Sequence, residues 1–450
     1  MSDLLSIGAS GVRAYGTALA AIGNNVSNAD TPGYTRRTVS LTENTASDGI
    51  GGLSTSLGQF GGVDTSEVGR AWNDFQAAAA RSSNSDAGAA DARATWLGNA
   101  ETALNDGTSG VGQSATAIFT AGDTLAADPG STGSRNAFLA SIGQTASAMN
   151  TTATALAQTS SGIASAAQTT VQTVNADLDQ LDKINTALAN QPSGTSAQAD
   201  LLDQRDSLLD DISGNVGISV SLAGNGAATV TLANSNVQLT RGANGSGAGA
   251  RLTLDTGANG ALAVQAVSAG AAQPVGDTGG SLGGLVSSAQ TVADQRSSLD
   301  KIAADFATAL NGWNAAGTTA AGAAGGALVT GTSAATLTVA TSDPAAIAAA
   351  SSTATNGNLL ALSSLRGATG IEQSWSGMVT DQGQIVSSAN SAQTAADATK
   401  TAAFNARDQS SGVNLDTEAA ELMRYQQAYS GAAKVIQTAK DTMQSILDLF

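Results

Sequence analysis

The fold is decided by residues 411–450, with the sequence SGVNLDTEAAELMRYQQAYSGAAKVIQTAKDTMQSILDLF. Counted in alternate steps of four and three, these residues form an apolar seam at coiled-coil spacing with two polar interruptions, Gln426 and Lys440. The seam comprises Leu415, Ala419, Leu422, Gln426, Tyr429, Ala433, Ile436, Lys440, Met443, Leu447 and Phe450. Asn414 or Asp416 is suited to cap its start. The pattern predicts a helix of ~36 residues and ~54 Å, which needs a partner.

The opposite terminus offers that partner, because residues 3–28 carry a narrow apolar stripe with the same alternation. The stripe comprises Leu5, Gly8, Val12, Tyr15, Leu19, Ile22 and Val26. A seam two positions wide per heptad suits a second helix better than a broad core, so the two ends are expected to pair. The periodicity fits equally well two terminal helices packed on an ordinary core.

Composition predicts an elongated, multidomain protein with thin cores. The 450 residues are enough for two to four domains, and 42% hydrophobic residues exclude a wholly disordered chain. Much of that fraction is alanine, aromatic residues make up 3%, and there are 52 glycines. Such cores bring backbones close together instead of filling space with large side chains.

The charge balance excludes two classes of partner. With 36 acidic against 19 basic residues, the net charge is -17 and the longest basic cluster is the pair Arg36 and Arg37. Nucleic acid requires a basic face to neutralise phosphates, so it is not an expected partner. An anionic membrane surface is disfavoured for the same reason, and no continuous apolar run is long enough to span a bilayer.

The chain has no cysteine and no histidine, which removes most catalytic and metal-binding chemistry. Thiol nucleophiles, Ser-His-Asp triads and His-ligated metals are excluded, and we expect no cofactor, no metal and no enzymatic activity. The N-terminal MSDLLSIGASG lacks a basic region and is amphipathic. It is therefore not expected to be a cleavable signal peptide.

Turn residues and changes of period divide the rest of the chain. Pro32 and Gly33 predict a turn, followed by a short strand at 36–41 and a Gly/Ser/Thr-rich loop at 43–63. Helices are expected at 67–104, interrupted near Gly88, then from 134, at 163–188 and at 199–212. From Val216 the period becomes two, which predicts short antiparallel strands. Helical spacing returns from Leu285, with one more strand near 337–339 and a helix at 374–407.

The predicted fold class is mainly α with an inserted β unit. Paired N- and C-terminal coiled-coil helices, a long helical bundle and a small antiparallel β domain follow from these patterns. The expected domains are a terminal helical domain (1–65 plus 408–450), a helical middle domain (66–215 plus 280–407) and an inserted β domain (216–279).

Two stretches near the termini carry a family resemblance. Asn28, Thr31, Gly33 and Tyr34 form the pattern N-x-x-T-x-G-Y, which resembles the N-terminal motif of bacterial flagellar rod, hook and hook-associated proteins. Residues 425–429 (YQQAY) and 433–436 (AKVI) look like their closing helix. Inside the chain, 201–211 (LLDQRDSLLDD), 279–285 (GGSLGGL) and 306–311 (FATALN) resemble the hook-associated protein 1 family. The resemblance covers most of the chain and is weakest at 345–410.

The resemblance implies a structural protein of the flagellum at the junction between hook and filament. It implies self-assembly in a helical ring, with the hook protein on one side and the next junction protein or flagellin on the other. It implies a secreted, extracellular location after export without a cleavable signal peptide. Whether an export chaperone covers the C-terminal helix stays open, as does any ligand of the β domain.

The expected assembly interface lies on the two terminal helices, which are predicted to order on docking because isolated helices are marginal in water. Its residues are Val12, Tyr15, Leu19, Ile22, Leu422, Tyr429, Ile436, Met443 and Leu447. Asn28, Thr31, Gly33 and Tyr34 are interpreted as a structural turn and not as a ligand site. Gln426 and Lys440 either set the register of the seam or face solvent.

Three alternative functions differ from this one in what they require of the sequence. A hook or distal rod protein would share both termini but lack the 201–211 segment and its β insertion, and a secreted adhesin would fold stably at both ends. A carboxylate enzyme would need aromatic residues for sugar stacking.

The aspartates of 200–211 (Asp200, Asp203, Asp206, Asp210 and Asp211) fit a solvated helix face with Arg205 nearby. The glycines of 279–284 fit a tight turn, since no Lys-Ser/Thr follows them.

Overall fold

The structure is a computed structural model that describes residues 2–31, 33–45, 60–104, 107–242, 247–367 and 369–448. It divides into two compact units, each built from distant parts of the chain. Unit 1 comprises Met1–Asn84, Val174–Arg251 and Ala398–Phe450, and unit 2 comprises Ser85–Thr173 and Leu252–Asp397. The predicted turn residue Pro32, most of the predicted loop at 43–63 and Phe450 lie outside the described residues.

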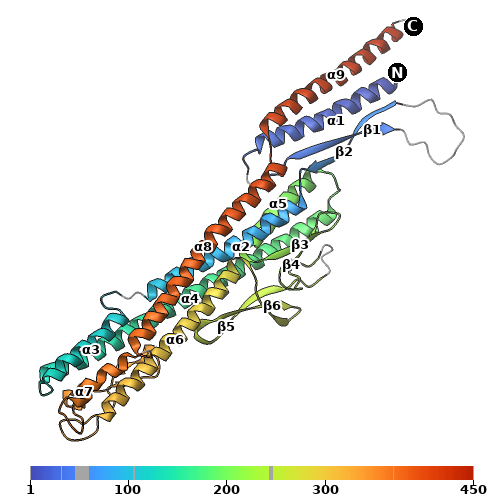
Figure 1. The fold of residues 1–450 in the computed structure, drawn as a ribbon. Coiled ribbons are helices and arrows are strands. Elements are labelled where there is room, and N and C mark those ends of the chain that lie inside the picture. Colours follow the sequence, from blue (N-terminus) through green and yellow to red (C-terminus); the bar gives the residue numbers. More distant parts are fainter. Residues whose placement is uncertain are drawn as a thin grey trace. The chain divides into compact units, whose positions relative to one another are not determined.

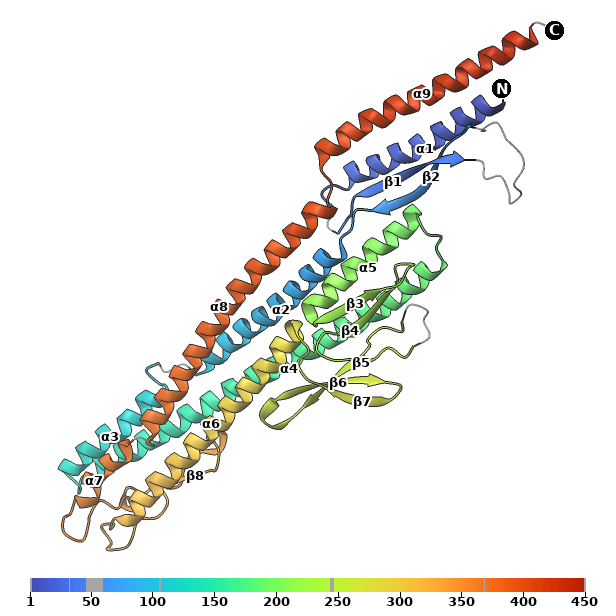
Figure 2. The same ribbon diagram turned by 45° about the vertical axis from the view of Figure 1, so that its right-hand side comes forward.

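In unit 1 the two terminal helices pair, as the sequence predicts. Helix α1 (Ser2–Ser27) lies beside α9 (Leu415–Leu447), and the hairpin of β1 (Arg37–Thr45) and β2 (Phe60–Arg70) lies along α1 (Figures 1 and 2). The side chain of Asn414 accepts hydrogen bonds from the N–H groups of Asp416 and Thr417 and so caps α9. Of the two predicted candidates, Asn414 and Asp416, Asn414 is therefore the cap.

Strand β2 was not predicted, and residues 67–70, expected to begin a helix, belong to it. Gly61, Gly62 and Gly69 weaken its local strand signal. Its pairing is decided by distant contacts: Val39 lies opposite Val68 on β1, and the N–H of Val63 donates to Ser10 Oγ on α1 at 3.2 Å. Ser66 is an extra residue in this ladder, because Ser40 pairs with Glu67 and Leu41 with Thr65.

The rest of unit 1 joins helix ends to a small sheet. Helix α5 (Ser196–Asn215) is capped by Thr195 and leads into the antiparallel pair β3 (Ile218–Leu222) and β4 (Ala228–Leu232). Buried Asn185, near the end of α4 (Thr132–Asn190), anchors this sheet. Its amide donates to the carbonyl of Ala228 and accepts from the N–H of Ala228, each at 2.8 Å.

Unit 2 is a helical bundle with a three-stranded sheet. It contains α3 (Val111–Ala127), α6 (Gly280–Ala316), α7 (Gly357–Ala361) and residues of α2 (Asp74–Ala103), α4 and α8 (Ile371–Ser411). The sheet has the order β5 (Arg251–Thr256), β6 (Leu262–Ser268), β7 (Ala271–Val275). A short pair, β8 (Val329–Thr330) and β9 (Thr338–Val339), accounts for the strand expected near 337–339.

The predicted fold class, mainly α with inserted antiparallel β, is confirmed, while three helix predictions need correction. Helix α2 runs through Gly88 without interruption, α3 was not predicted, and α4 joins two expected helices into one of 59 residues. Between 134 and 163 the polar residues of α4 are accommodated locally, since the hydroxyls of Thr145 and Thr159 donate to carbonyls four residues earlier. The three-domain division and the elongated shape stay predictions.

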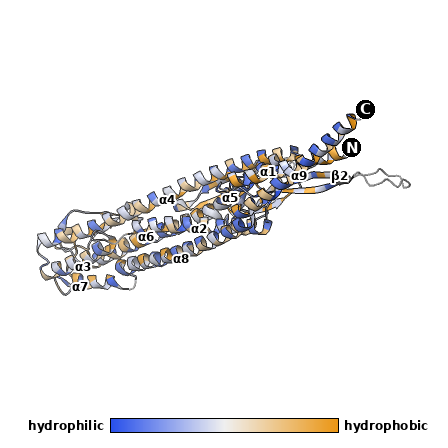
Figure 3. Cartoon of the chain, turned by 90° about the horizontal axis from the view of Figure 1, so that it is seen from above, coloured by the Kyte–Doolittle hydropathy of each residue, from blue (hydrophilic) through white to orange (hydrophobic). Residues whose placement is uncertain are grey.

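Orange and blue segments alternate along the helices in Figure 3, as expected for helices that bury one side. No helix among the described residues is both long enough and apolar enough to cross a membrane. The expected close backbone approach is present in unit 2. A Cβ at Gly284 of α6 would lie 2.3 Å from the carbonyl oxygen of Ala89 and 2.9 Å from Cβ of Ala92, both on α2.

We expect Gly284→Ala to destabilise unit 2 by about 1–3 kcal/mol, because the added methyl group overpacks two backbones that have no room to separate locally. Gly312→Ala, in the same helix, is the matched control, since a Cβ there meets no atom within 4 Å. It should stabilise by about 0.5–1 kcal/mol through helix propensity. Urea denaturation followed by circular dichroism measures both. Equal effects of the two substitutions would contradict the close approach.

Candidate assembly site at the paired terminal helices

The seam between α1 and α9 is antiparallel and built mainly from small residues. A Cβ at Gly8 would lie 2.6 Å from Ile436 Cγ1, and one at Gly11 would lie 3.0 Å from Ala432 Cβ. The rings of Tyr15 and Tyr425 are tilted by 43° with centroids 6.3 Å apart. The buried residues of α1 are Gly8, Gly11, Ala14, Ala18, Ala21, Ile22 and Asn25. At Gly8 and Gly11, the close approach of α9 therefore leaves no room for a larger side chain.

The predicted interface residues divide by exposure. Ile22 is buried. Five more are half-buried: Val12, Tyr15, Leu19, Leu422 and Ile436. Tyr429, Met443 and Leu447 are exposed to 38%, 40% and 63%. The seam of α9 therefore runs about one position away from the predicted one, through Tyr425, Ala428, Ala432 and Ala439, and leaves part of the predicted apolar row at the surface. Their role in assembly stays a prediction.

The two polar interruptions of the predicted seam face solvent. Gln426 and Lys440 are both exposed, so neither lies in the contact with α1. Of the two readings of these residues, the solvent-facing one holds. Every described residue from Asp441 to Asp448 is also exposed, including the apolar Met443, Ile446 and Leu447.

A buried polar contact, which the apolar pattern of α1 does not predict, closes the base of the seam. Asn25 is 1% exposed, and its Oδ1 accepts from the N–H of Arg37 at 2.8 Å and from the Tyr34 hydroxyl at 2.9 Å. Its Nδ2 donates to the carbonyl of Arg37 and to Glu418 Oε2, each at 3.0 Å. One amide therefore joins α1, β1 and the first turn of α9. The only signal in the sequence is an asparagine near the end of an apolar helix.

The motif turn forms its own hydrogen bonds, consistent with the structural interpretation. Asn28 Nδ2 donates to the carbonyl of Asn24, and its Oδ1 accepts from the Thr31 hydroxyl at 3.2 Å. Gly33 has φ +78°, a conformation that favours glycine. The N–H of Tyr34 then donates to the carbonyl of Thr31. The turn thus directs the Tyr34 side chain back to Asn25.

The environment of Tyr34 shifts its ionisation. Burial raises the pKa of Tyr34 to about 12, and the nearby guanidinium of Arg37, 5.1 Å from the ring centroid, opposes the shift. The carboxylates of Asp203, Asp200 and Glu418 add to the rise in this pKa. The phenol therefore stays neutral and acts as a hydrogen-bond donor.

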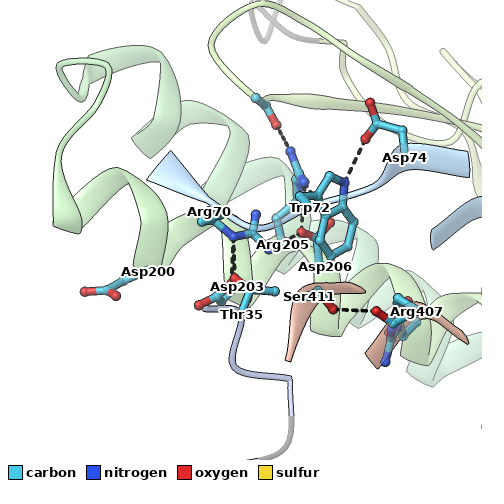
Figure 4. A network of polar contacts seen from close by, with 12 residues as sticks. Thr35, Arg70, Trp72, Asp74, Asp200, Asp203, Arg205, Asp206, Arg407 and Ser411 are labelled. Atoms are coloured by element: carbon cyan, nitrogen blue, oxygen red, sulfur yellow. Dashed lines mark hydrogen bonds and ion pairs between the residues drawn. The ribbon is translucent and has the colours of Figure 1, made fainter. Parts of the chain in front are cut away.

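Below the seam, aspartates of α5 pair with arginines from four other segments. Figure 4 shows part of this network, with Asp203 and Asp206 near Arg70 and Arg205. Asp203 contacts Arg37 at 2.6 Å and Arg70 at 2.8 Å, and Asp206 contacts Arg70 at 2.7 Å. The remaining pairs are Arg37 with Asp200, Arg81 with Asp206 and Asp210, Arg205 with Asp206, and Arg407 with Asp210. This Arg–Asp network ties β1, β2, α2 and α8 to α5.

The network corrects the interpretation of these aspartates as a solvated helix face. Asp203, Asp206 and Asp210 recur at three and four residues and so share one face of α5, which is covered by the arginines. Asp200, with its side chain 66% exposed, and Asp211 remain near solvent. Burial lowers the pKa of Arg205, and its pairing with Asp206 opposes that shift.

The hydrogen bonds of the network run from arginine to aspartate. The carboxylates of Asp203 and Asp206 accept hydrogen bonds from the guanidinium groups of Arg37, Arg70 and Arg81. In the described ranges, no group of three or more acidic side chains is arranged to hold a metal ion.

We expect Asp206→Asn to destabilise unit 1 by about 3–5 kcal/mol, because it leaves the buried guanidinium of Arg205 without its counter-charge. Asp200→Asn is the matched control on the same helix, and at an exposed site it should cost less than about 1 kcal/mol. Both values come from urea denaturation. A cost below about 1 kcal/mol for Asp206→Asn would contradict the network's role.

The raised pKa of Tyr34 predicts a stability change at high pH. The folded state holds the phenolic proton more tightly than the unfolded chain, so this contribution is complete below pH 10 and is lost as the pH rises toward about 12. Absorbance titration at 295 nm should show one tyrosine with the high pKa, which disappears in Tyr34→Phe. That variant should also lose about 1 kcal/mol from the hydrogen bond to Asn25. An unchanged titration curve would refute the assignment to Tyr34.

Comparison with known proteins agrees with this arrangement. The family model "Flagellar hook-associated protein FlgK helical domain" matches residues 97–329. The two ends match models of flagellar rod proteins: "Flagella basal body rod protein" at 5–35 and "Flagellar basal body rod FlgEFG protein C-terminal" at 407–449. The solved structure of the flagellar hook junction protein FlgK from Burkholderia pseudomallei is similar in fold, with a TM-score of 0.50 and 21% identity over 56% of this chain and 46% of that one.

Curated relatives carry the name flagellar hook-associated protein 1. The Escherichia coli protein is 28% identical over 72% of this chain and 59% of its own length. The Salmonella typhimurium protein is 28% identical over 52% of this chain and 42% of its own length. The Bacillus subtilis protein is 31% identical over 49% of this chain and 44% of its own length. The matches thus span about two fifths to three fifths of the relatives. Since the helical-domain model covers more than half of this sequence, the chain belongs to the flagellar hook-associated protein FlgK family.

Proposed function

We propose that this chain is a structural component of the bacterial flagellum that forms the junction between hook and filament. The proposal rests on family membership and on one structural observation. Tyr429, Met443 and Leu447 are exposed on α9, although α9 already has α1 as a partner. An apolar row at the surface of a paired helix is suited to further helix packing in an assembly.

The proposed partners are other copies of this chain, in a helical ring, and the neighbouring flagellar proteins. Contacts that do not close between two copies extend identical chains into a ring or tube. The hook protein would lie on one side, and the next junction protein or flagellin on the other. The support for these neighbours is the rod-protein family match at both ends, where α1 and α9 lie.

Export and assembly would depend on the uneven packing of α9. Its base is capped by Asn414 and contacts Asn25 through Glu418, whereas residues 441–448 are exposed. We propose that this distal part orders on docking at the growing structure, because a helix without tertiary contacts is marginal in water. An export chaperone would bind the same exposed apolar residues. Localisation is proposed to be extracellular, after export.

The alternatives fit less well. A hook or distal rod protein would account for the matches at the two ends but not for the FlgK helical domain at 97–329. A secreted adhesin would leave the exposed row of α9 without a purpose. The arginine–aspartate pairs of unit 1 join separate segments of the chain, which supports a structural role.

We expect the triple variant Tyr429→Ser, Met443→Ser, Leu447→Ser to bind isolated hooks at least about tenfold more weakly, because each substitution removes apolar area from the proposed contact. Binding is measured by cosedimentation of the purified chain with hooks. Motility of a strain that carries only the variant gene should be lost.

Phe75→Ser and Leu360→Ser provide the control. Both side chains are exposed, to 82% and 63%, and both lie outside α1 and α9. These variants should bind hooks like the unmodified chain, and all variants should keep its thermal transition. Normal hook binding by the triple variant would refute the proposed interface, and absence of binding by the unmodified chain would refute the proposed function.

A further inference from the structure

We propose that the buried contact between Glu418 and Asn25 determines the register of α9 against α1. The inference deepens the proposed function and rests on it, because the register sets which apolar residues of the helix pair are presented for assembly. Glu418 and Asn25 are positioning residues in this account. Neither was expected to have a role from the seam pattern.

The small-residue seam by itself selects the register weakly. Ile436 packs over Gly8, and Gly11, almost one turn further along α1, offers a second position without a side chain. Ala428 and Ala432 lie one turn apart on α9 and present the same methyl group to α1. A slip of one helical turn in one direction, about 5.4 Å, would still place small residues opposite Gly8 and Gly11, although it would separate the rings of Tyr15 and Tyr425.

The polar contact does not survive such a slip. In an antiparallel pair, moving α9 by four residues places Leu422 opposite Asn25 in one direction, and places Glu418 opposite buried Ala21 in the other. Either slip leaves a donor of Asn25 and the Glu418 carboxylate without their partner. An unpaired buried polar group is costly, and an unpaired charge more so.

Asn25 is held in position for this contact by groups outside α9. Its oxygen is used by Arg37 and Tyr34, and one of its two amide hydrogens by the Arg37 carbonyl. The second hydrogen is directed to α9. Glu418 is 2% exposed and lies in the first turn of α9, where the helix dipole favours a negative charge. A carboxylate at this one position can therefore be buried without a basic partner on α1.

The absence of cysteine allows the register to be measured directly by engineered disulfides in the full-length chain. Gly11→Cys with Ala432→Cys reports the observed register, since the two Cβ positions are 3.0 Å apart. Gly11→Cys with Ala428→Cys, or with Ile436→Cys, reports a slip of one turn in either direction. Each pair is tested in the unmodified, Glu418→Gln and Glu418→Leu backgrounds, and cross-linking rates are followed by loss of free thiols under mild oxidation.

In the unmodified and Glu418→Gln chains, the observed-register pair should cross-link at least about tenfold faster than either slipped pair, because the glutamine oxygen still accepts from Asn25. In Glu418→Leu the observed-register pair should cross-link at a rate within about twofold of that of a slipped pair. The slipped pair should also cross-link faster than it does in the unmodified chain. Circular dichroism should show unchanged helix content.

A tenfold preference retained in Glu418→Leu would overturn the proposal, and so would a loss of preference in Glu418→Gln. If Glu418→Leu forms none of the three cross-links, the contact is needed for pairing itself and the register proposal also fails. The readout uses the chain before assembly, so its outcome is separate from that of the hook-binding experiment.

Discussion

Buried charge must be paired, and in unit 1 this requirement holds distant segments of the chain together. Asp203, Asp206 and Asp210 of α5 lie among arginines from β1, β2, α2 and α8. Replacing such a network by apolar residues can preserve stability, but removing one partner leaves a charge in a poorly solvated place. The segments that carry the arginines are therefore placed by α5, and with them the bases of both terminal helices.

The second constraint is the scarcity of large side chains. Glycine and alanine let α1 approach α9, and in unit 2 they let α6 approach α2. Such contacts gain dispersion energy from backbones in close packing but carry little shape information along a helix. Polar contacts at fixed positions, such as that of Asn25 with Glu418 or Asn185 with Ala228, add the positional specificity that small residues lack.

These two features explain how α1 and α9 pair at the base of α9 while the distal turns of α9 keep apolar residues exposed. The base of α9 is capped by Asn414 and bonded to α1, while its distal turns keep apolar residues at the surface. A protein that assembles only with the correct neighbours benefits from ends of this kind, since the unassembled chain does not satisfy them.

The sequence by itself determined the fold class, the pairing of the ends, most helices and the family, because periodicity and the turn residues at 28–34 are local signals. It did not reveal strand β2, which residues of α9 face α1, or the role of Asn25. Those were decided by tertiary structure: β2 forms because Val63 and Val68 meet Ser10 and Val39, residues far from them along the chain. The aspartates of α5 show the same limit, since whether a carboxylate faces water or an arginine depends on what a distant segment places beside it.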